Sequence, residues 1–192
     1  MLQINMGAFI VRLLLSLLAI ILWAFFFSCK QKNDHSKEIG RLDSALINLK
    51  EAERDFFSAD TTSMRTSFNF AAGKLHVIAN KIAKDTLKKN TVSFLSNAFE
   101  HTGNLQNLLD NKKFWERALK ESAQKIDDLK HDLKEDLIEN NKSQEYIANE
   151  INTSKKICET VGRTINKAKS SVVQLDSMKT ALIHLSDSLQ SK

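Results

Sequence analysis

Residues 104–139, NLQNLLDNKKFWERALKESAQKIDDLKHDLKEDLIE, carry the clearest structural signal in the chain. Nine positions in this segment follow one another at alternating steps of three and four residues, and seven of them are apolar. They are Leu105, Leu108, Lys112, Trp115, Leu119, Ser122, Ile126, Leu129 and Leu133. This spacing places one side chain per turn on the same face of an α-helix. The segment therefore predicts an amphipathic helix over 104–139.

Two segments upstream show the same spacing. Segment 36–57 has a single apolar stripe, and residues 58–62 supply a turn with capping side chains. Segment 62–101 continues the stripe, although the pattern weakens at residues 88–90, where a break is the alternative to one uninterrupted helix. Gly103 suits the left-handed residue that ends a helix, and Asn104 suits the cap of the next one. We therefore expect helices over 36–57 and 62–101, with a boundary at Gly103.

The segment downstream begins with a polar interruption at residues 139–142. A turn is the preferred interpretation, and a polar position inside one very long helix is the alternative. Apolar residues then mark a helix over 142–190, from Ile147 to Leu189. The apolar stripe of this helix drifts around its surface, which indicates packing against more than one neighbouring helix.

The composition agrees with this pattern of long helices. The chain of 192 residues has no proline and 5 glycines, where average usage would give about ten and thirteen. Collagen-like and turn-rich β-sandwich folds need proline or glycine at many positions, so this composition excludes them. Short connections force sequential helices to run antiparallel. The expected fold is an all-α, elongated up-and-down antiparallel helical bundle, or coiled-coil hairpins, with residues 36–192 as one domain.

The N-terminus has the features of an export signal. Arg12 precedes an apolar run over residues 13–27, and Ser28-Cys29 follows that run. A basic start, a short apolar core and a small residue before the cleavage point are typical of secretory signals. Residues 1–28 are therefore expected to be a signal peptide, and residues 29–35 a tether to the bundle.

The segment Phe26-Phe27-Ser28-Cys29 resembles a lipobox, the lipidation motif of bacterial lipoproteins. The aromatic-rich run that ends in Ser-Cys-Lys resembles lipoproteins of the Bacteroidota. The resemblance covers about the first thirty residues and departs from the family pattern at Phe26, where leucine is usual. It implies that Cys29 is acylated and becomes the new N-terminus, which would hold the protein on the outer membrane.

An uncleaved inner-membrane signal anchor is the alternative, because residues 8–27 are long enough to span a bilayer. Lys30, Lys32 and Lys37 would then lie on the translocated side, against the positive-inside tendency. The lipoprotein interpretation is preferred for this reason.

Cys158 would be the only thiol left in a lipidated chain. It shares a helical face with Ile151, Val161 and Ile165, so it is expected to be a core thiol. An intermolecular disulfide across a dimer is the alternative.

The remaining residues give little indication of chemistry. Asp128, His131, Asp132 and Glu135 share a helical face and are the nearest approach to a metal-ligand set. They are expected to form a solvated face, because a di-iron bundle needs two Glu-x-x-His motifs. No catalytic motif or cofactor is indicated. Lysines interleave with acids, so nucleic acid is not an expected partner.

These observations favour a non-catalytic protein of the bacterial cell envelope, of structural or interaction type. Its partners would be membrane lipid, through Cys29, and either another envelope protein or a second copy of the chain. A periplasmic ligand- or metal-binding bundle is the alternative.

Overall fold

The computed structural model describes residues 34–82 and 88–191, and these residues form helices joined by short connections. The helices are α2 (Ser36–Phe57), α3 (Thr61–Lys81), α4 (Lys89–Asp110), α5 (Lys112–Lys134) and α6 (Asn140–Gln190). Residues His35–Lys192 cluster into one compact unit. The expected all-α helical bundle is confirmed, and α2 has the bounds that the sequence predicted. No helix within the described ranges combines the length and apolarity needed to cross a membrane.

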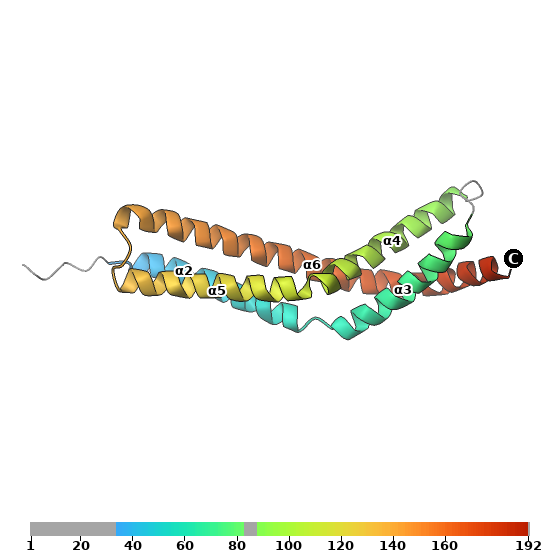
Figure 1. The fold of residues 1–192 in the computed structure, drawn as a ribbon, viewed down its shortest axis with the longest axis horizontal. Coiled ribbons are helices and arrows are strands. Elements are labelled where there is room, and N and C mark those ends of the chain that lie inside the picture. The colour runs from blue at the N-terminus through green and yellow to red at the C-terminus, as the bar shows by residue number, and fades with distance from the viewer. Residues whose placement is uncertain (1–33, 83–87, 192) are drawn as a thin grey trace, which may run out of the picture. The chain divides into compact units, whose positions relative to one another are not determined.

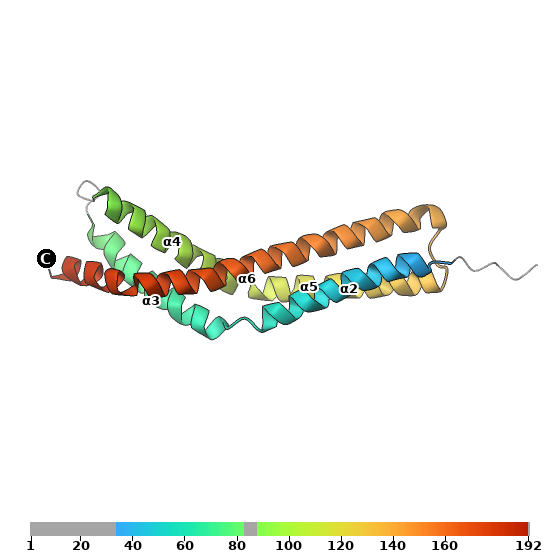
Figure 2. The ribbon, with the colours of Figure 1, turned by 180° about the vertical axis from the view of Figure 1, so that it is seen from behind.

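The helices of residues 34–82 and 88–191 form three legs that run side by side (Figures 1 and 2). The first leg is α2 followed by α3, the second is α4 followed by α5, and the third is α6 alone. Helix α6 packs against all four of the others, whereas α2 packs on α5 and α3 packs on α4. Consecutive legs run antiparallel to each other. Within the first leg, however, α3 continues beyond the end of α2 instead of folding back on it, so these two sequential helices are not an antiparallel pair.

The connection between α2 and α3 is set by its capping side chain. The Asp60 carboxylate accepts hydrogen bonds from the backbone N–H groups of Thr62 at 3.1 Å and Ser63 at 3.0 Å. This satisfies two of the N–H groups that the first turn of a helix leaves unpaired. Phe56, Ala59 and Met64 are buried around this connection. The predicted turn and caps over residues 58–62 are therefore confirmed.

The prediction of one helix over 62–101 is wrong. Helix α3 ends at Lys81, α4 begins at Lys89, and the two helices pack on each other. The physical reason is that their apolar faces need a common partner. Leu75 and Ile78 of α3 form a cluster with Leu95 and Ala98 of α4 and with Leu182 of α6. The weakening of the pattern at residues 88–90 marked the start of the second helix.

The boundary predicted at Gly103 is also wrong, and so is the start of the 104–139 helix. Gly103 lies inside α4, and no described glycine has a positive φ. The break falls at Asn111, which has φ −94° and ψ 6°. Its amide Nδ2 donates to the backbone oxygen of Asn107 at 3.0 Å and to the Asn107 Oδ1 at 2.7 Å. Asparagine side chains that bond locally to the backbone compete with helical hydrogen bonding.

Helix α5 ends at Lys134, earlier than the expected residue 139. Asp136 follows with φ 54°, the left-handed conformation that closes many helices. The backbone N–H of Leu137 donates to the oxygen of Asp132 at 2.9 Å, and that of Asp136 donates to the oxygen of Leu133 at 3.3 Å. These two bonds form a Schellman motif. The turn that the sequence placed at 139–142 is thus confirmed as a turn but lies over residues 135–139.

Helix α6 is the common core element of the bundle. Its buried positions recur every seven residues, at Ile147, Ser154, Val161, Ala168, Leu175 and Leu182. The apolar residues beside this row differ along the helix. Ile151, Cys158 and Val172 pack on the larger core cluster, and Met178, Leu185 and Leu189 pack on the smaller one. The drift predicted contact with more than one neighbour, and this is confirmed.

The tether that the sequence predicted over residues 29–35 ends before His35, because His35 is packed in the bundle. His35 is 8% exposed, and its Nε2 lies 3.9 Å from Oδ1 of Asp136. It is therefore packed between the start of α2 and the turn that joins α5 to α6.

Candidate functional site

The residue that the sequence singles out most strongly, Cys29, lies outside the described residues. The signal peptide over 1–28 and the tether over 29–33 do so as well. The described residues contribute several grooves between the legs, and these grooves place the other candidate residues.

Cys158 is half-buried on α6 and has no disulfide partner. It lines a groove of about 280 Å³ together with Ala45 and Asn48 of α2 and with Ile151 and Ser154 of α6. Burial raises the pKa of the Cys158 thiol above its ordinary value. A thiol with a raised pKa holds less of the reactive thiolate at neutral pH. This environment is that of a packing residue facing a shallow groove.

The four predicted candidates for metal ligation do not come together. Asp128 and Asp132 line a groove of about 460 Å³ between α5 and α6, whereas His131 and Glu135 are exposed and lie outside it. Within residues 34–82 and 88–191, no group of three or more His, Cys, Asp or Glu side chains is arranged to hold a metal ion.

The same groove contains residues that sequence reasoning did not connect with Asp128. Lys125 and Leu129 complete its α5 wall, and Tyr146, Asn149 and Glu150 line it from α6. The Asp128 carboxylate accepts a hydrogen bond from Nε2 of Gln124 at 2.7 Å. The sequence predicted that these two helices lie side by side, but it did not show which residues of α6 lie opposite Asp128.

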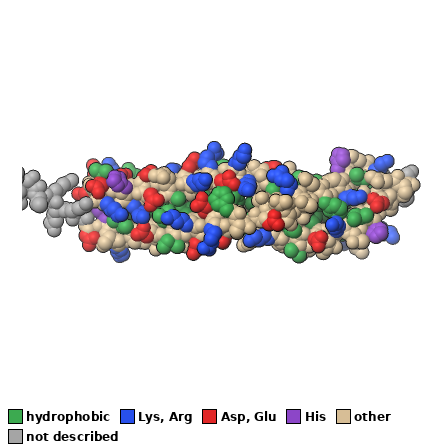
Figure 3. Space-filling model, turned by 90° about the horizontal axis from the view of Figure 1, so that it is seen from below, with side chains coloured by type: hydrophobic (Ala, Val, Ile, Leu, Met, Phe, Trp, Pro, Cys, Tyr) green, Lys and Arg blue, Asp and Glu red, His purple; other side chains and the backbone are tan. Residues whose placement is uncertain are grey.

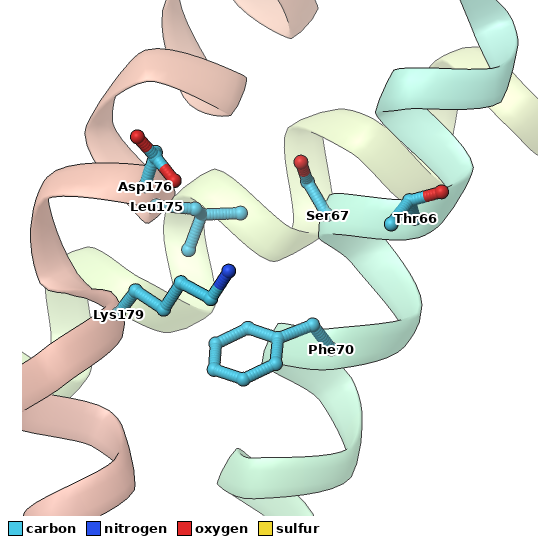
Figure 4. Close-up of a pocket in the computed structure, with 6 residues that line it drawn as sticks. All are labelled: Thr66, Ser67, Phe70, Leu175, Asp176 and Lys179. Atoms are coloured by element: carbon cyan, nitrogen blue, oxygen red, sulfur yellow. The ribbon is translucent and has the colours of Figure 1, made fainter.

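A smaller pocket of about 150 Å³ lies between α3 and α6 (Figure 4). Thr66, Ser67 and Phe70 face it from α3, and Leu175, Asp176 and Lys179 face it from α6. The Lys179 ammonium lies 5.4 Å from the centre of the Phe70 ring. This is within the range of a cation–π contact. The pocket is thus closed in part by its own lysine.

The two adjacent aromatic pairs divide between core and surface. Phe56 is buried and Phe57 is 51% exposed, while Trp115 is half-buried and Phe114 is 50% exposed. The ammonium of Lys120 lies 6.0 Å from the centre of the Phe57 ring. Exposed aromatic side chains are enriched at sites of protein contact. Elsewhere, acidic and basic side chains interleave over much of the face shown in Figure 3.

A buried polar cluster joins α4 to α6. Ser171 is 1% exposed, and its hydroxyl lies 3.2 Å from Nδ1 of His101. Asn104 Nδ2 donates to the same hydroxyl at 3.3 Å. No sequence motif indicates this cluster, since Ser171 lies 70 residues from His101 and 67 residues from Asn104. The buried hydroxyl is satisfied within the core, which is what a structural contact requires.

The arrangement therefore provides grooves between helices, exposed aromatic side chains and a half-buried thiol. We compared the chain with protein-family models, curated proteins and solved structures, and none of them matches it.

Proposed function

We propose that the chain is a lipid-anchored protein of the bacterial cell envelope that acts by contact with other proteins and not by catalysis. The observation that carries the proposal is the lipobox-like segment Phe26-Phe27-Ser28-Cys29 at the end of an apolar run. Cys29 precedes the start of α2 at Ser36 by only seven residues. An acylated Cys29 would thus hold a folded bundle close to a membrane, on the outer membrane facing the periplasm or the cell surface.

The form of the bundle supports a contact function. A helix of 51 residues such as α6 extends ~75 Å at 1.5 Å per residue. A three-leg bundle of this length has a thin core and a large lateral surface. Phe57 and Phe114 place aromatic rings on that surface. Such a surface suits an interaction with another envelope protein or with a second copy of the chain.

The anchor is tested by mass spectrometry of the protein isolated from membranes. We expect a mature N-terminus at Cys29 that carries acyl chains, and a Cys29→Ala variant that leaves the membrane fraction. Cys158→Ala is the matched control and should stay in the membrane fraction, because Cys158 lies within the bundle. An unacylated N-terminus at Met1, with Cys29→Ala still in the membrane, would instead support the inner-membrane signal anchor.

The contact function is tested by crosslinking in intact cells. We expect crosslinked partners that are lost when Phe57 and Phe114 are both changed to serine. Val173, which is 66% exposed on α6, provides the control substitution Val173→Ser. Bound metal in elemental analysis, or a chromophore in the visible spectrum of the purified protein, would favour the ligand- or metal-binding alternative.

A further inference from the structure

A polar groove between α4 and α6 differs from the other grooves in its side chains. It has a volume of about 190 Å³ and is lined by Asn104 and Asn107 of α4 and by Thr160, Arg163, Thr164 and Lys167 of α6. None of these six side chains is a carboxylate. The carboxylates closest along the two helices, Glu100, Asp110 and Glu159, do not line it.

The hydrogen bonds around the groove leave donors facing it. The Oδ1 of Asn107 already accepts from Asn111 at 2.7 Å, which leaves the two N–H bonds of the Asn107 amide to donate. Asn104 uses one N–H bond on the buried Ser171 hydroxyl, which fixes its side chain at the groove. The hydroxyls of Thr160 and Thr164 donate to backbone oxygens of α6 at 2.7 and 2.8 Å. The free donors of the groove are thus amide, guanidinium and ammonium groups.

Neither cation of the groove is neutralised inside the described part of the chain. The ion pairs found there involve other residues, and Glu159, one turn before Arg163, pairs with Lys155 at 4.0 Å. Residues 155–169 of α6 contain five basic residues and one acidic residue, whereas the whole chain has a net charge of only +5. This stretch of α6 therefore has a local net charge of +4, and Arg163 and Lys167 bring part of that charge into the groove.

We propose that this groove binds a phosphate group. A phosphate oxygen is an acceptor only, and Arg163 offers the planar donor pair that matches two such oxygens. Lys167 supplies a second positive charge one turn away, and the Asn107 amide supplies neutral donors from the opposite wall. The phosphate group belongs either to a free phosphate compound or to the phosphodiester of an anionic lipid headgroup, and both sources present the same chemistry. The inference does not depend on lipidation of Cys29.

The test uses the full chain in a non-ionic detergent at low ionic strength, because salt screens exposed charges. Inorganic phosphate is titrated calorimetrically against a chloride control of equal ionic strength. Glycerophosphoglycerol, the deacylated headgroup of an anionic lipid, is titrated in the same way. We expect binding that weakens at least about tenfold in Arg163→Gln, since a hydrogen bond to a charged group contributes more than 1.4 kcal/mol.

Two further variants separate the groove from general electrostatics. Lys156→Gln and Lys169→Gln remove exposed charges of α6 that lie outside the groove, and each should retain nearly all of the binding. Asn107→Ala keeps the net charge unchanged and should weaken binding several-fold. An equal loss in the groove variants and the control variants would overturn the proposal, as would the absence of binding to both compounds at millimolar concentration.

The two titrations also identify the source of the phosphate group. Tighter binding of inorganic phosphate supports a free phosphate compound as the ligand. Tighter binding of the glycerol diester supports a lipid headgroup. Circular dichroism of each variant confirms that the bundle remains folded, so that a loss of binding reports on the groove.

Discussion

Lys130 joins two helices of the bundle through its ammonium group. It lies 2.7 Å from the Asp43 carboxylate on α2 and 3.4 Å from the Asp127 carboxylate on its own helix. The hydrogen bond to Asp43 is the main reason that the pKa of Lys130 is raised above its ordinary value of 10.5. Because the folded-state pKa is the higher one, this contribution to stability is complete below pH ~10.4 and is lost as the pH rises through the folded-state pKa.

We therefore predict that Lys130→Met lowers the free energy of unfolding by about 0.5–1 kcal/mol at pH 7, the usual range for a partly exposed ion pair. The difference from the wild type should stay constant up to pH ~10 and shrink above it. Urea denaturation at several pH values measures this. Lys50→Met, on the exposed face of α2, is the control and should show a much smaller difference. A difference that grows in alkaline solution would contradict the assignment.

Gly103 provides a test of the helix boundary at the level of one residue. The sequence favoured a left-handed conformation for this glycine, in which alanine is strained. The structure instead places it inside α4, with nothing within 4 Å of an added Cβ atom. We predict that Gly103→Ala raises the free energy of unfolding by about 0.5–1 kcal/mol.

Gly162, which lies inside α6 with equally open space around it, is the matched comparison for Gly103. Urea denaturation should give a similar gain for Gly162→Ala. A loss of stability in Gly103→Ala alone would restore the boundary that the sequence favoured.

Helix α6 buries several serine side chains among its apolar residues, and the hydroxyls of these serines differ in whether they have a hydrogen-bond partner. Ser186 is fully buried, and its hydroxyl has no hydrogen-bond partner within the described residues. Ser154 is also buried, but its hydroxyl donates to the backbone oxygen of Ile151 at 2.8 Å. An unpaired buried hydroxyl costs about 1–3 kcal/mol.

We predict that Ser186→Ala raises the free energy of unfolding by about 1 kcal/mol. Ser154→Ala should change it by no more than about 0.5 kcal/mol, since the lost hydrogen bond offsets the gain in helix propensity. Thermal and urea denaturation of both variants measure the difference. Equal effects at the two positions would show that the Ser186 hydroxyl is satisfied in solution.

The helices themselves could be predicted from spacing, but several of their ends could not. Helices α2 and α6 have the expected bounds to within two residues, because each is flanked by polar turn residues. The break at Asn111 was missed because the alternating spacing of three and four residues passes through it without interruption. The separation of α3 from α4 was only the alternative interpretation, because the stripe weakens at residues 88–90 but resumes on the far side.

The candidate sites could also be predicted only in part from the sequence. Spacing along one helix put Asp128 and Asp132 on the same face, and both do line one groove. The residues on the opposite wall of that groove depend on which stretch of α6 lies beside α5. The residues that line the groove proposed to bind phosphate depend in the same way on which stretch of α6 lies beside α4. That register is set by the lengths of the legs and by core packing, which a single sequence does not contain.

At the scale of the whole bundle, α6 is the leg that runs without a break. The first leg is interrupted at residues 58–60 and the second at Asn111, so the two breaks must be bridged by α6. The core passes from the larger cluster to the smaller one along this helix, through Leu175 and Leu182. A bundle built on one long helix cannot shorten without breaking that helix, so its length is a direct consequence of the continuity of α6.

We predict that a chain starting at residue 30 has a radius of gyration of about 22 Å in small-angle X-ray scattering, as expected for a rod ~75 Å long. A compact domain of about 160 residues would give about 15 Å. Light scattering on the same sample establishes whether the chain is a monomer, because self-association would also raise the value. A monomer with a radius of gyration near 15 Å would mean that α6 folds back on itself. Such a fold would separate α4 from the stretch of α6 that carries Arg163 and would remove the phosphate groove along with the extended surface.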